Sequence, residues 1–393
     1  MINKLKNAAW LHDEATQKIF EILDGKDKCT RAVGGIVRDT IMGRNGEKTD
    51  IDFATEILPN KVIERAKKAN IAYYPTGIEH GTITLRIGKK TFEITTLRQD
   101  KKTDGRHAEV SFGTDWTIDA KRRDFTINAL YLDMNGELFD PLNGLEDCLA
   151  SRVKFIGNAE NRIKEDKLRV YRFFRFSASH GGQNFDATGL RACNKFANDL
   201  SEISAERIGA EMLKILSLKQ AAKTLKIMSG AGVFLLEEKI LKQFFLYEEF
   251  CEDPKTTARL ALISTQFTLN KLQKIWRLSN AQKSAISAYI KAADLVQKNH
   301  LNELVYRYAD IKENIAPFAA ALFDLQKQDM EELSRKLSSF FAPPFPISGK
   351  DLIAKGFTPS PALGLELKKL EREWLKSDFR LSKDELLALR DHV

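Results

Sequence analysis

The sequence predicts an α+β protein, in which a small mixed sheet with helices is followed by an all-helical remainder. Two observations support this class. From about residue 28 to 140, short β-type runs alternate with turn residues, and helical segments flank them at roughly 10–24 and 59–70. Beyond about residue 160, apolar residues recur every three or four positions, which is the spacing of helices that pack on one face.

Composition narrows the class of protein. The length of 393 residues favours two or three domains, and the net charge of +8 is compatible with a polyanionic partner. No run approaches the roughly 18 consecutive apolar residues of a membrane-spanning helix, and the acidic pair Asp13–Glu14 argues against a secretory signal. Four scattered cysteines without metal-ligand spacing predict reduced thiols and a cytoplasmic protein: Cys29, Cys148, Cys193 and Cys251.

Turn residues mark the expected elements. The runs 81–87 and 91–97, joined by Gly88-Lys89-Lys90, predict an antiparallel hairpin, and a second hairpin is expected around Asn135-Gly136. In the helical part, Gly181-Gly182 and the Gly230/Gly232 pair are expected helix stops. The proline-rich stretch near residues 343–346 should break the helical run before a final helical pair.

The first segment with chemical content is RAVGGIVRDT. Residues 31–33 read as a strand, Gly34 and Gly35 permit a tight turn, and a helix then opens. Amide groups at such a turn suit a phosphate, and Arg38 in the first helical turn adds a cation. A purely structural strand–helix turn is the alternative, and on this segment alone it is the more common case.

Two aspartates follow on a predicted strand. Side chains alternate along a strand, so Asp50 and Asp52 share one face while Ile51 and Phe53 point to the core. Two adjacent carboxylates repel each other, and a divalent cation relieves that repulsion. An exposed acidic edge strand is the alternative. Glu93, on the outer face of the first hairpin, is either a third ligand or a solvated side chain.

Two charged segments lie further along. The first charged segment precedes an expected apolar strand and consists of Arg122, Arg123 and Asp124. Its side chains either contact a nucleotide or form ion pairs within a loop. In EDKLRVYRFFRF, four charged residues repeat every third position on an expected continuous helix: Asp166, Arg169, Arg172 and Arg175. A salt-bridged surface helix is the alternative, although three phenylalanines make a fully solvated helix unfavourable: Phe173, Phe174 and Phe176.

Together, GGxxRD, DxD, RRDFTxNA and EDxxR in this order resemble the class II tRNA nucleotidyltransferase and bacterial poly(A) polymerase family, whose head domain is of the polymerase-β type. The resemblance implies that Asp50 and Asp52 hold two Mg²⁺ ions. It implies that Arg123 and Asp124 contact the sugar and phosphates, and that Asp166 and Arg169 pair with the base edge of CTP or ATP. It places Gly34, Gly35 and Arg38 at the phosphates, and gives Arg172 and Arg175 to the triphosphate or primer.

The same resemblance implies three parts: a catalytic head at 1–148, a base-recognising neck at 149–220, and a tRNA-binding body and tail at 221–393. It implies untemplated addition of C, C and A to tRNA. Poly(A) polymerase is a rival, as is an enzyme adding only CC or only A. The element Asp104-Gly105-Arg106 favours the full activity. A non-catalytic RNA-binding protein is a remote alternative. C-terminal stretches such as FPISGKDL resemble the proteobacterial type.

Overall fold

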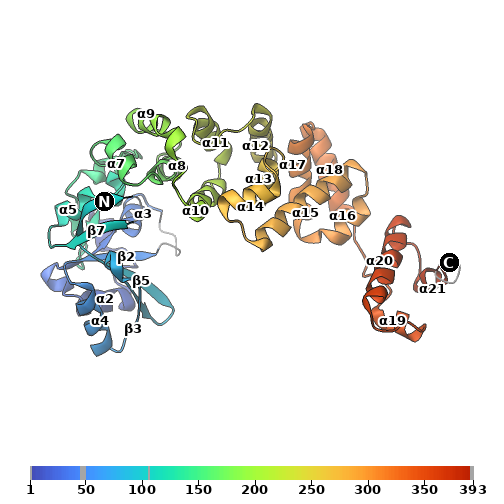
Figure 1. Ribbon diagram of the computed structural model, residues 1–393, viewed down its shortest axis with the longest axis horizontal. Helices are drawn as coiled ribbons and strands as arrows, with labels where there is room; N and C mark the ends of the chain where they lie inside the picture. The colour runs from blue at the N-terminus through green and yellow to red at the C-terminus, as the bar shows by residue number, and fades with distance from the viewer. Residues whose placement is uncertain (1, 45–49, 105–106, 390–393) are drawn as a thin grey trace. The chain divides into compact units, whose positions relative to one another are not determined.

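The computed structural model describes residues 2–44, 50–104 and 107–389 (Figure 1). The chain divides into two compact units, Met1–Leu235 and Leu236–Val393, which are described separately. The predicted α+β class is confirmed. The strands lie in the first unit, and helices are the only regular secondary structure among the described residues of the second unit.

A seven-stranded mixed sheet forms the centre of the first unit, with the order β3-β4-β5-β2-β1-β8-β9. Strand β2 pairs antiparallel with β1 and parallel with β5. Both predicted hairpins are present, as the pairs β4–β5 and β8–β9. The strands are β1 (Thr30–Val33), β2 (Ile51–Thr55), β3 (Ala72–Gly77), β4 (Thr82–Ile87), β5 (Lys90–Thr96), β8 (Tyr131–Leu132) and β9 (Leu138–Phe139).

A separate two-stranded ribbon joins β6 (Arg98–Asp104) to β7 (His107–Phe112). Of the Asp104-Gly105-Arg106 element, Asp104 ends β6, and Gly105 and Arg106 lie outside the described residues. The helices of the first unit are α1 (Ile2–Lys6), α2 (Glu14–Ile22), α3 (Gly35–Ile41), α4 (Pro59–Lys68), α5 (Trp116–Lys121), α6 (Gly144–Leu149), α7 (Ala159–Glu165), α8 (Arg169–Ser179), α9 (Ala187–Lys195), α10 (Ala205–Leu216) and α11 (Ala221–Gly230).

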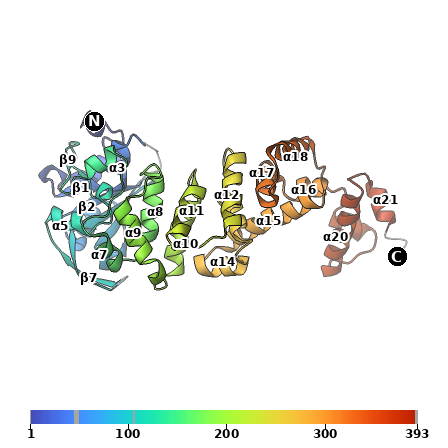
Figure 2. The same cartoon turned by 90° about the horizontal axis from the view of Figure 1, so that it is seen from above.

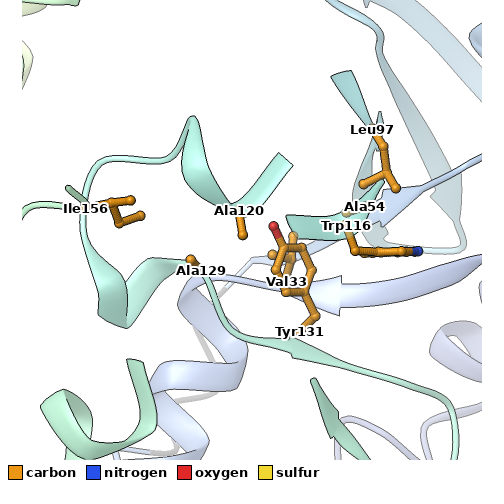
Figure 3. Packing of buried hydrophobic residues seen from close by; sticks show 8 residues of the cluster. All are labelled: Val33, Ala54, Leu97, Trp116, Ala120, Ala129, Tyr131 and Ile156. Atoms are coloured by element: carbon orange, nitrogen blue, oxygen red, sulfur yellow. The ribbon is translucent and has the colours of Figure 1, made fainter. Parts of the chain in front are cut away.

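Buried side chains from the middle strands and α5 anchor the face of the sheet behind the predicted site (Figure 3). Val33 and Ala54 come from β1 and β2, and Trp116 lies edge-on to Tyr131 with ring centroids 5.4 Å apart. Such an aromatic pair adds about 0.5–1.5 kcal/mol beyond the area it buries. The strands that carry the glycine loop and the aspartates are therefore fixed by packing on their inner side.

The second unit is built from helices, which Figure 2 shows from above in yellow to red. They are α12 (Glu238–Phe250), α13 (Thr256–Ile263), α14 (Leu269–Trp276), α15 (Asn280–Gln297), α16 (Leu301–Arg307), α17 (Lys312–Phe323), α18 (Lys327–Ser339), α19 (Gly349–Ala354), α20 (Pro361–Lys376) and α21 (Lys383–Ala388). The break after α18 is confirmed, but three helices follow it in place of the expected pair. Among the described residues, no helix is both long enough and apolar enough to cross a membrane.

Candidate active site

The glycine loop forms the turn between β1 and α3, as predicted. Gly34 has φ +73°, a backbone conformation that side chains with a Cβ rarely adopt, and it precedes the first turn of α3. The buried Arg38 is fixed from two sides, because Nε donates to Asp39 Oδ1 at 2.8 Å and Nη1 donates to Asn128 Oδ1 at 2.6 Å. The loop and its arginine therefore face the same site.

Asp52 lies on β2 directly beside Glu93 of β5 in the parallel register. Burial, the Glu93 carboxylate and Asp50 raise the pKa of Asp52 to about 6, while Arg123 opposes them. Asp50 is exposed and precedes the strand, and Thr49 lies outside the described residues. The negative charges of Asp50 and Glu93 thus both act on Asp52, as expected for a site that binds a cation.

A divalent cation fits the chemistry of this donor set. Carboxylate oxygens are the ligands that Mg²⁺ prefers, and the raised pKa of Asp52 shows that the protein alone does not compensate its negative charge. Within the described residues, however, no group of three or more His, Cys, Asp or Glu side chains is gathered as a ligand set. The participation of Glu93 therefore stays a prediction.

Arg123 is held by Asp119 of α5, at 3.2 Å, and by the Tyr131 hydroxyl. Burial would raise the pKa of Asp119, but Arg123 and Arg122 together hold it below its ordinary value. Asp119 is thus the ionised partner that orients both arginines of the RRD segment. The expected strand after this segment begins only at Tyr131, because residues 126–128 form a 3₁₀ turn.

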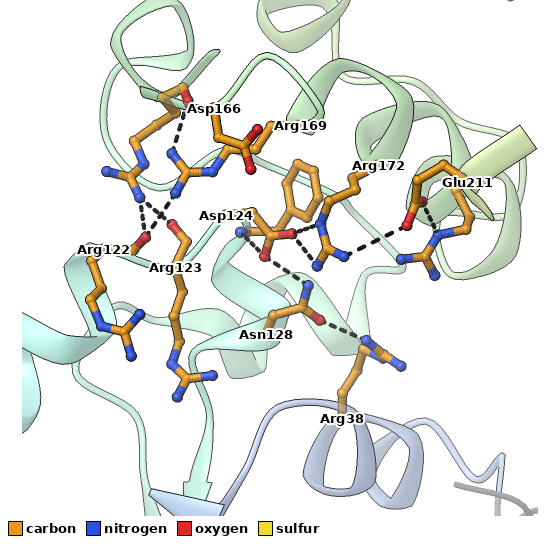
Figure 4. Close-up of polar contacts among 12 residues, drawn as sticks. Arg38, Arg122, Arg123, Asp124, Asn128, Asp166, Arg169, Arg172 and Glu211 are labelled. Carbon is orange, nitrogen blue, oxygen red and sulfur yellow. Dashed lines mark hydrogen bonds and ion pairs between the residues drawn. The ribbon is translucent and has the colours of Figure 1, made fainter. Parts of the chain in front are cut away.

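Asp124 is the centre of a polar network (Figure 4). Its Oδ1 accepts from the Phe125 amide at 2.9 Å and from Asn128 Nδ2 at 3.0 Å. Its Oδ2 lies 2.7 Å from Arg172 Nε and 2.6 Å from Nη2. All four acceptor positions of the carboxylate are in use, so a ribose hydroxyl would have to displace one of these donors.

The expected continuous helix over EDKLRVYRFFRF is wrong. Helix α7 ends at Glu165, Asp166 has the extended φ of −152°, and α8 begins at Arg169. The cause is local, because Asp166 Oδ1 accepts from the backbone amide of Leu168 at 3.1 Å and so competes with the helical hydrogen bonds. Asp166 is therefore at the junction of two helices and not on a stripe with the three arginines.

Each of these charged side chains has a defined partner. Asp166 Oδ2 accepts from Arg207 of α10 at 2.7 Å. Arg169 donates to Glu165 at 2.7 Å, to the Arg162 carbonyl at 2.8 Å and to the Arg122 carbonyl at 3.0 Å. The sequence alone assigns no catalytic role to the segment containing Arg207, yet the structure brings this arginine to the site.

The two following arginines share the buried Glu211 of α10. Arg175 Nε donates to Glu211 Oε2 at 2.6 Å, and Arg172 Nη1 lies 3.9 Å from Oε1. The guanidiniums of Arg38, Arg172 and Arg175 lie 5.1, 5.2 and 4.1 Å from the ring centroid of Phe176. The Phe176 ring thus lies within cation–π distance of three guanidiniums, one from α3 and two from α8.

A cavity of about 430 Å³ lies over these groups. It brings together most of the predicted site residues, with six arginines against three aspartates, which suits a polyanion. Asp50 and Glu93 do not line it. The lining residues are Gly34, Gly35, Arg38, Asp52, Arg122, Arg123, Asp124, Asn128, Asp166, Arg169, Arg172, Arg175 and Phe176.

Comparison with protein families gives two matches. Residues 30–154 match the poly A polymerase head domain, and residues 184–242 match the probable RNA and SrmB-binding site of polymerase A. The first match contains the glycine loop, Asp52, Glu93 and the RRD segment. The second contains Arg207 and Glu211.

Curated relatives match along nearly the whole chain. The mitochondrial CCA tRNA nucleotidyltransferase 1 of Mus musculus is 35% identical over 96% of this chain and 90% of its own length. The CCA-adding enzyme of Leuconostoc mesenteroides is 32% identical over 86% of each. The crystal structure of the Bacillus stearothermophilus CCA-adding enzyme in complex with CTP superposes with a TM-score of 0.74 at 26% identity, over 93% of this chain and 94% of that one. The chain therefore belongs to the family of CCA-adding tRNA nucleotidyltransferases.

Proposed function

We propose that this protein adds C, C and A to the 3′ end of tRNA, using CTP and ATP without a nucleic-acid template and releasing pyrophosphate. The observation that carries the proposal is the cavity that joins the glycine loop, Asp52, the RRD segment and the Asp166–Arg169 junction. The same activity is supported by the similarity to two relatives, which are named CCA tRNA nucleotidyltransferase and CCA-adding enzyme.

The phosphates of the incoming nucleotide lie, in this proposal, against the Gly34–Gly35 turn, Arg38 and Arg123. Asp50 and Asp52 would hold two Mg²⁺ ions, which supply activation of the primer 3′-hydroxyl and compensation of charge on the phosphoryl group. The arginines add fixed positive charge where negative charge develops in the transition state. Because Asp119 and Asn128 already orient these arginines, little reorganisation is needed during the reaction.

Base choice rests, in this proposal, on Asp166 and Arg169. A carboxylate accepts from the exocyclic amino group that cytosine and adenine share, and a guanidinium donates to ring acceptors. Uracil and guanine present a carbonyl at that position, which would oppose the carboxylate. Arg172 and Arg175 extend the positive surface toward the triphosphate or the primer. Asp124 contacts the sugar when a ribose hydroxyl displaces one of its four donors.

We assign a catalytic head to residues 1–148, a base-recognising neck to 149–220, and a tRNA-binding body and tail to 221–393. The second unit contains a cavity of about 1170 Å³ whose lining includes six cations and four carboxylates. The cations suit RNA phosphates: Lys291, Arg307, Lys336, Lys368, Arg372 and Lys376. The likeness of the C-terminal stretches to the proteobacterial type and the cytoplasmic location stay predictions of the sequence.

The test is incorporation of labelled CTP and ATP, with Mg²⁺, into tRNA that lacks its CCA end. Ordered addition of two C and one A supports the proposal. Long A tails would assign a poly(A) polymerase, and addition of only CC or only A would assign a partial enzyme. A folded wild-type chain that incorporates neither nucleotide, while a known CCA-adding enzyme does so in parallel, would overturn the proposal.

A further inference from the structure

Helix α3, behind the glycine loop, and the C-terminal end of helix α8 are joined by Asp39 and His180. A single oxygen, Asp39 Oδ1, accepts from Arg38 Nε at 2.8 Å and lies 3.2 Å from His180 Nε2. The side chains of Asp39 and His180 are 14% and 11% exposed, so water competes little for this contact. The residues are 141 positions apart, and His180 belongs to none of the sequence motifs.

Burial of the ring and its contact with Asp39 together favour one form of His180. Burial, chiefly, lowers the pKa of His180, which favours a neutral ring, and the charges that face it are Asp39, Arg38 and Arg44. A neutral ring can donate to Asp39 only with its proton on Nε2. Its Nδ1 can then accept from the Ser179 hydroxyl at 2.6 Å, whose single proton is shared between Nδ1 and the Arg175 carbonyl at 2.8 Å. In this form His180 is a fixed donor to Asp39.

Arg38 has one nitrogen left for a ligand. Its Nε is bound by Asp39 and its Nη1 by Asn128, while Nη2 donates to no protein group in the described part of the chain. Arg38 lines the active-site cavity, and its guanidinium faces the Phe176 ring. The orientation of Nη2 is therefore set by Asp39 and Asn128.

Resting on the proposed function, we propose that His180 is a positioning residue for nucleotide addition. By donating to Asp39, it fixes the carboxylate that orients Arg38, so that Nη2 is directed at the nucleotide's phosphates. CTP and ATP share the triphosphate, so this role concerns both nucleotides equally and leaves base choice to other residues. The contact also ties α8, which begins with Arg169, to the helix behind the phosphate loop.

The test compares three full-length variants. His180→Leu removes the donor, His180→Gln places an amide N–H near the position of Nε2, and His180→Asn keeps polarity but falls short of Asp39. For His180→Leu and His180→Asn we expect KM, and the dissociation constant measured by calorimetry, to rise about tenfold for both CTP and ATP, as for a lost hydrogen bond to a charged group. The kcat/KM ratios of CTP to UTP and of ATP to GTP should stay unchanged, and His180→Gln should restore most of the affinity.

A double variant shows whether His180 acts through Asp39. In an Asp39→Asn background, His180→Leu should cost little further affinity, because the orienting carboxylate is already lost. Additive losses, equal affinities of the Leu and Gln variants, or a changed base preference would overturn the positioning role. If His180→Leu does not fold, the Asn and Gln variants make the same comparison.

The outcomes separate this role from the proposed function. A wild-type chain that binds neither CTP nor ATP would overturn both. A wild type that binds both nucleotides, with unchanged affinity in the Leu and Asn variants, would overturn the role of His180 and leave the proposed function standing.

Discussion

Replacing Asp166 by asparagine tests the proposed base recognition directly. The structure fixes this carboxylate at both oxygens, since Oδ1 accepts from the Leu168 amide at 3.1 Å and Oδ2 accepts from Arg207 at 2.7 Å. A carboxylate oxygen can accept two hydrogen bonds, so each oxygen keeps one free position. One of these positions is enough to accept from the amino group of cytosine or adenine.

The size of the effect follows from these contacts. A hydrogen bond to a charged group contributes about 1.5–3 kcal/mol, so its loss should lower kcat/KM for CTP and ATP about ten- to a hundredfold. The oxygen of the introduced asparagine should remain with Arg207, because the arginine can only donate. The amide NH₂ then replaces Oδ1, so the hydrogen bond from the Leu168 amide is lost, and the NH₂ can donate to the carbonyl of uracil or guanine. UTP and GTP should therefore gain relative to CTP and ATP.

The assay is single-nucleotide addition to tRNA lacking its CCA end, or only its last A, with each of the four nucleotides. Asp199→Asn is the matched control, because Asp199 is an exposed aspartate of the same unit that pairs with Lys167 at 2.8 Å. It should leave all four values of kcat/KM unchanged. An equal loss for all four nucleotides in Asp166→Asn would show that Asp166 serves only its salt bridge to Arg207.

Four further predictions concern charged side chains. Because the pKa of Asp52 is raised to about 6, its ionisation opposes folding once pH exceeds the unfolded value near 4. In EDTA the wild type should therefore lose about 2–3 kcal/mol relative to Asp52→Asn between pH 4 and 7, by denaturant titration; parallel pH profiles would contradict this. The same variant should retain its fold and lose C and A addition. Glu211→Gln leaves the buried Arg175 without its carboxylate, while Arg172 keeps Asp124, and should destabilise the first unit by about 3–5 kcal/mol in urea. The exposed Glu202→Gln should change stability by less than about 1 kcal/mol. Similar values for both would refute the importance of burial. The double variant Lys368→Gln/Lys376→Gln should weaken tRNA binding. It should also reduce the slope of log affinity against log salt by about 0.7–0.9 for each phosphate that is no longer neutralised, whereas the control Lys18→Gln in the first unit should not. An unchanged slope in the double variant would place the tRNA elsewhere.

The fold could be predicted where the signals are local. Hairpins with Gly at the turn and helices with a three-to-four-residue period lie at the expected places. The pairing of Asp52 with Glu93 could not be predicted from the sequence. The alternation of side chains along a strand gives the face of each residue but not the register between distant strands. The spacing of Leu272, Ile275 and Leu278 predicts one helical stretch from Lys271 to Lys283. In the structure, Arg277 adopts φ +48° between α14 and α15. The sequence does contain a signal for this break, because Ser279 and Gln282 have the spacing of the capping box that starts α15.

The site was predictable as a set of charges but not as a set of pairs. The i+3 spacing of charges suggests one helix, while the turn made by Asp166 with Leu168 breaks it. Arg207, Glu211 and His180 could not be identified as partners, because each acts on a residue at least 36 positions away. Long-range ion pairs leave no periodicity in a sequence. A buried acid such as Glu211 on an amphipathic helix looks the same as an exposed one until its neighbours are known.

The network from Asp124 through Arg172 and Glu211 to Arg175 has a consequence for the order in which the protein matures on the ribosome. The glycine loop, Asp52 and the RRD segment are synthesised first, but the carboxylate that neutralises two of the arginines arrives only with α10. Until α10 has been made, Arg175 lacks the carboxylate that holds it, whereas Arg172 can already pair with Asp124. The cationic side of the site is therefore complete only after α10 has packed against α8.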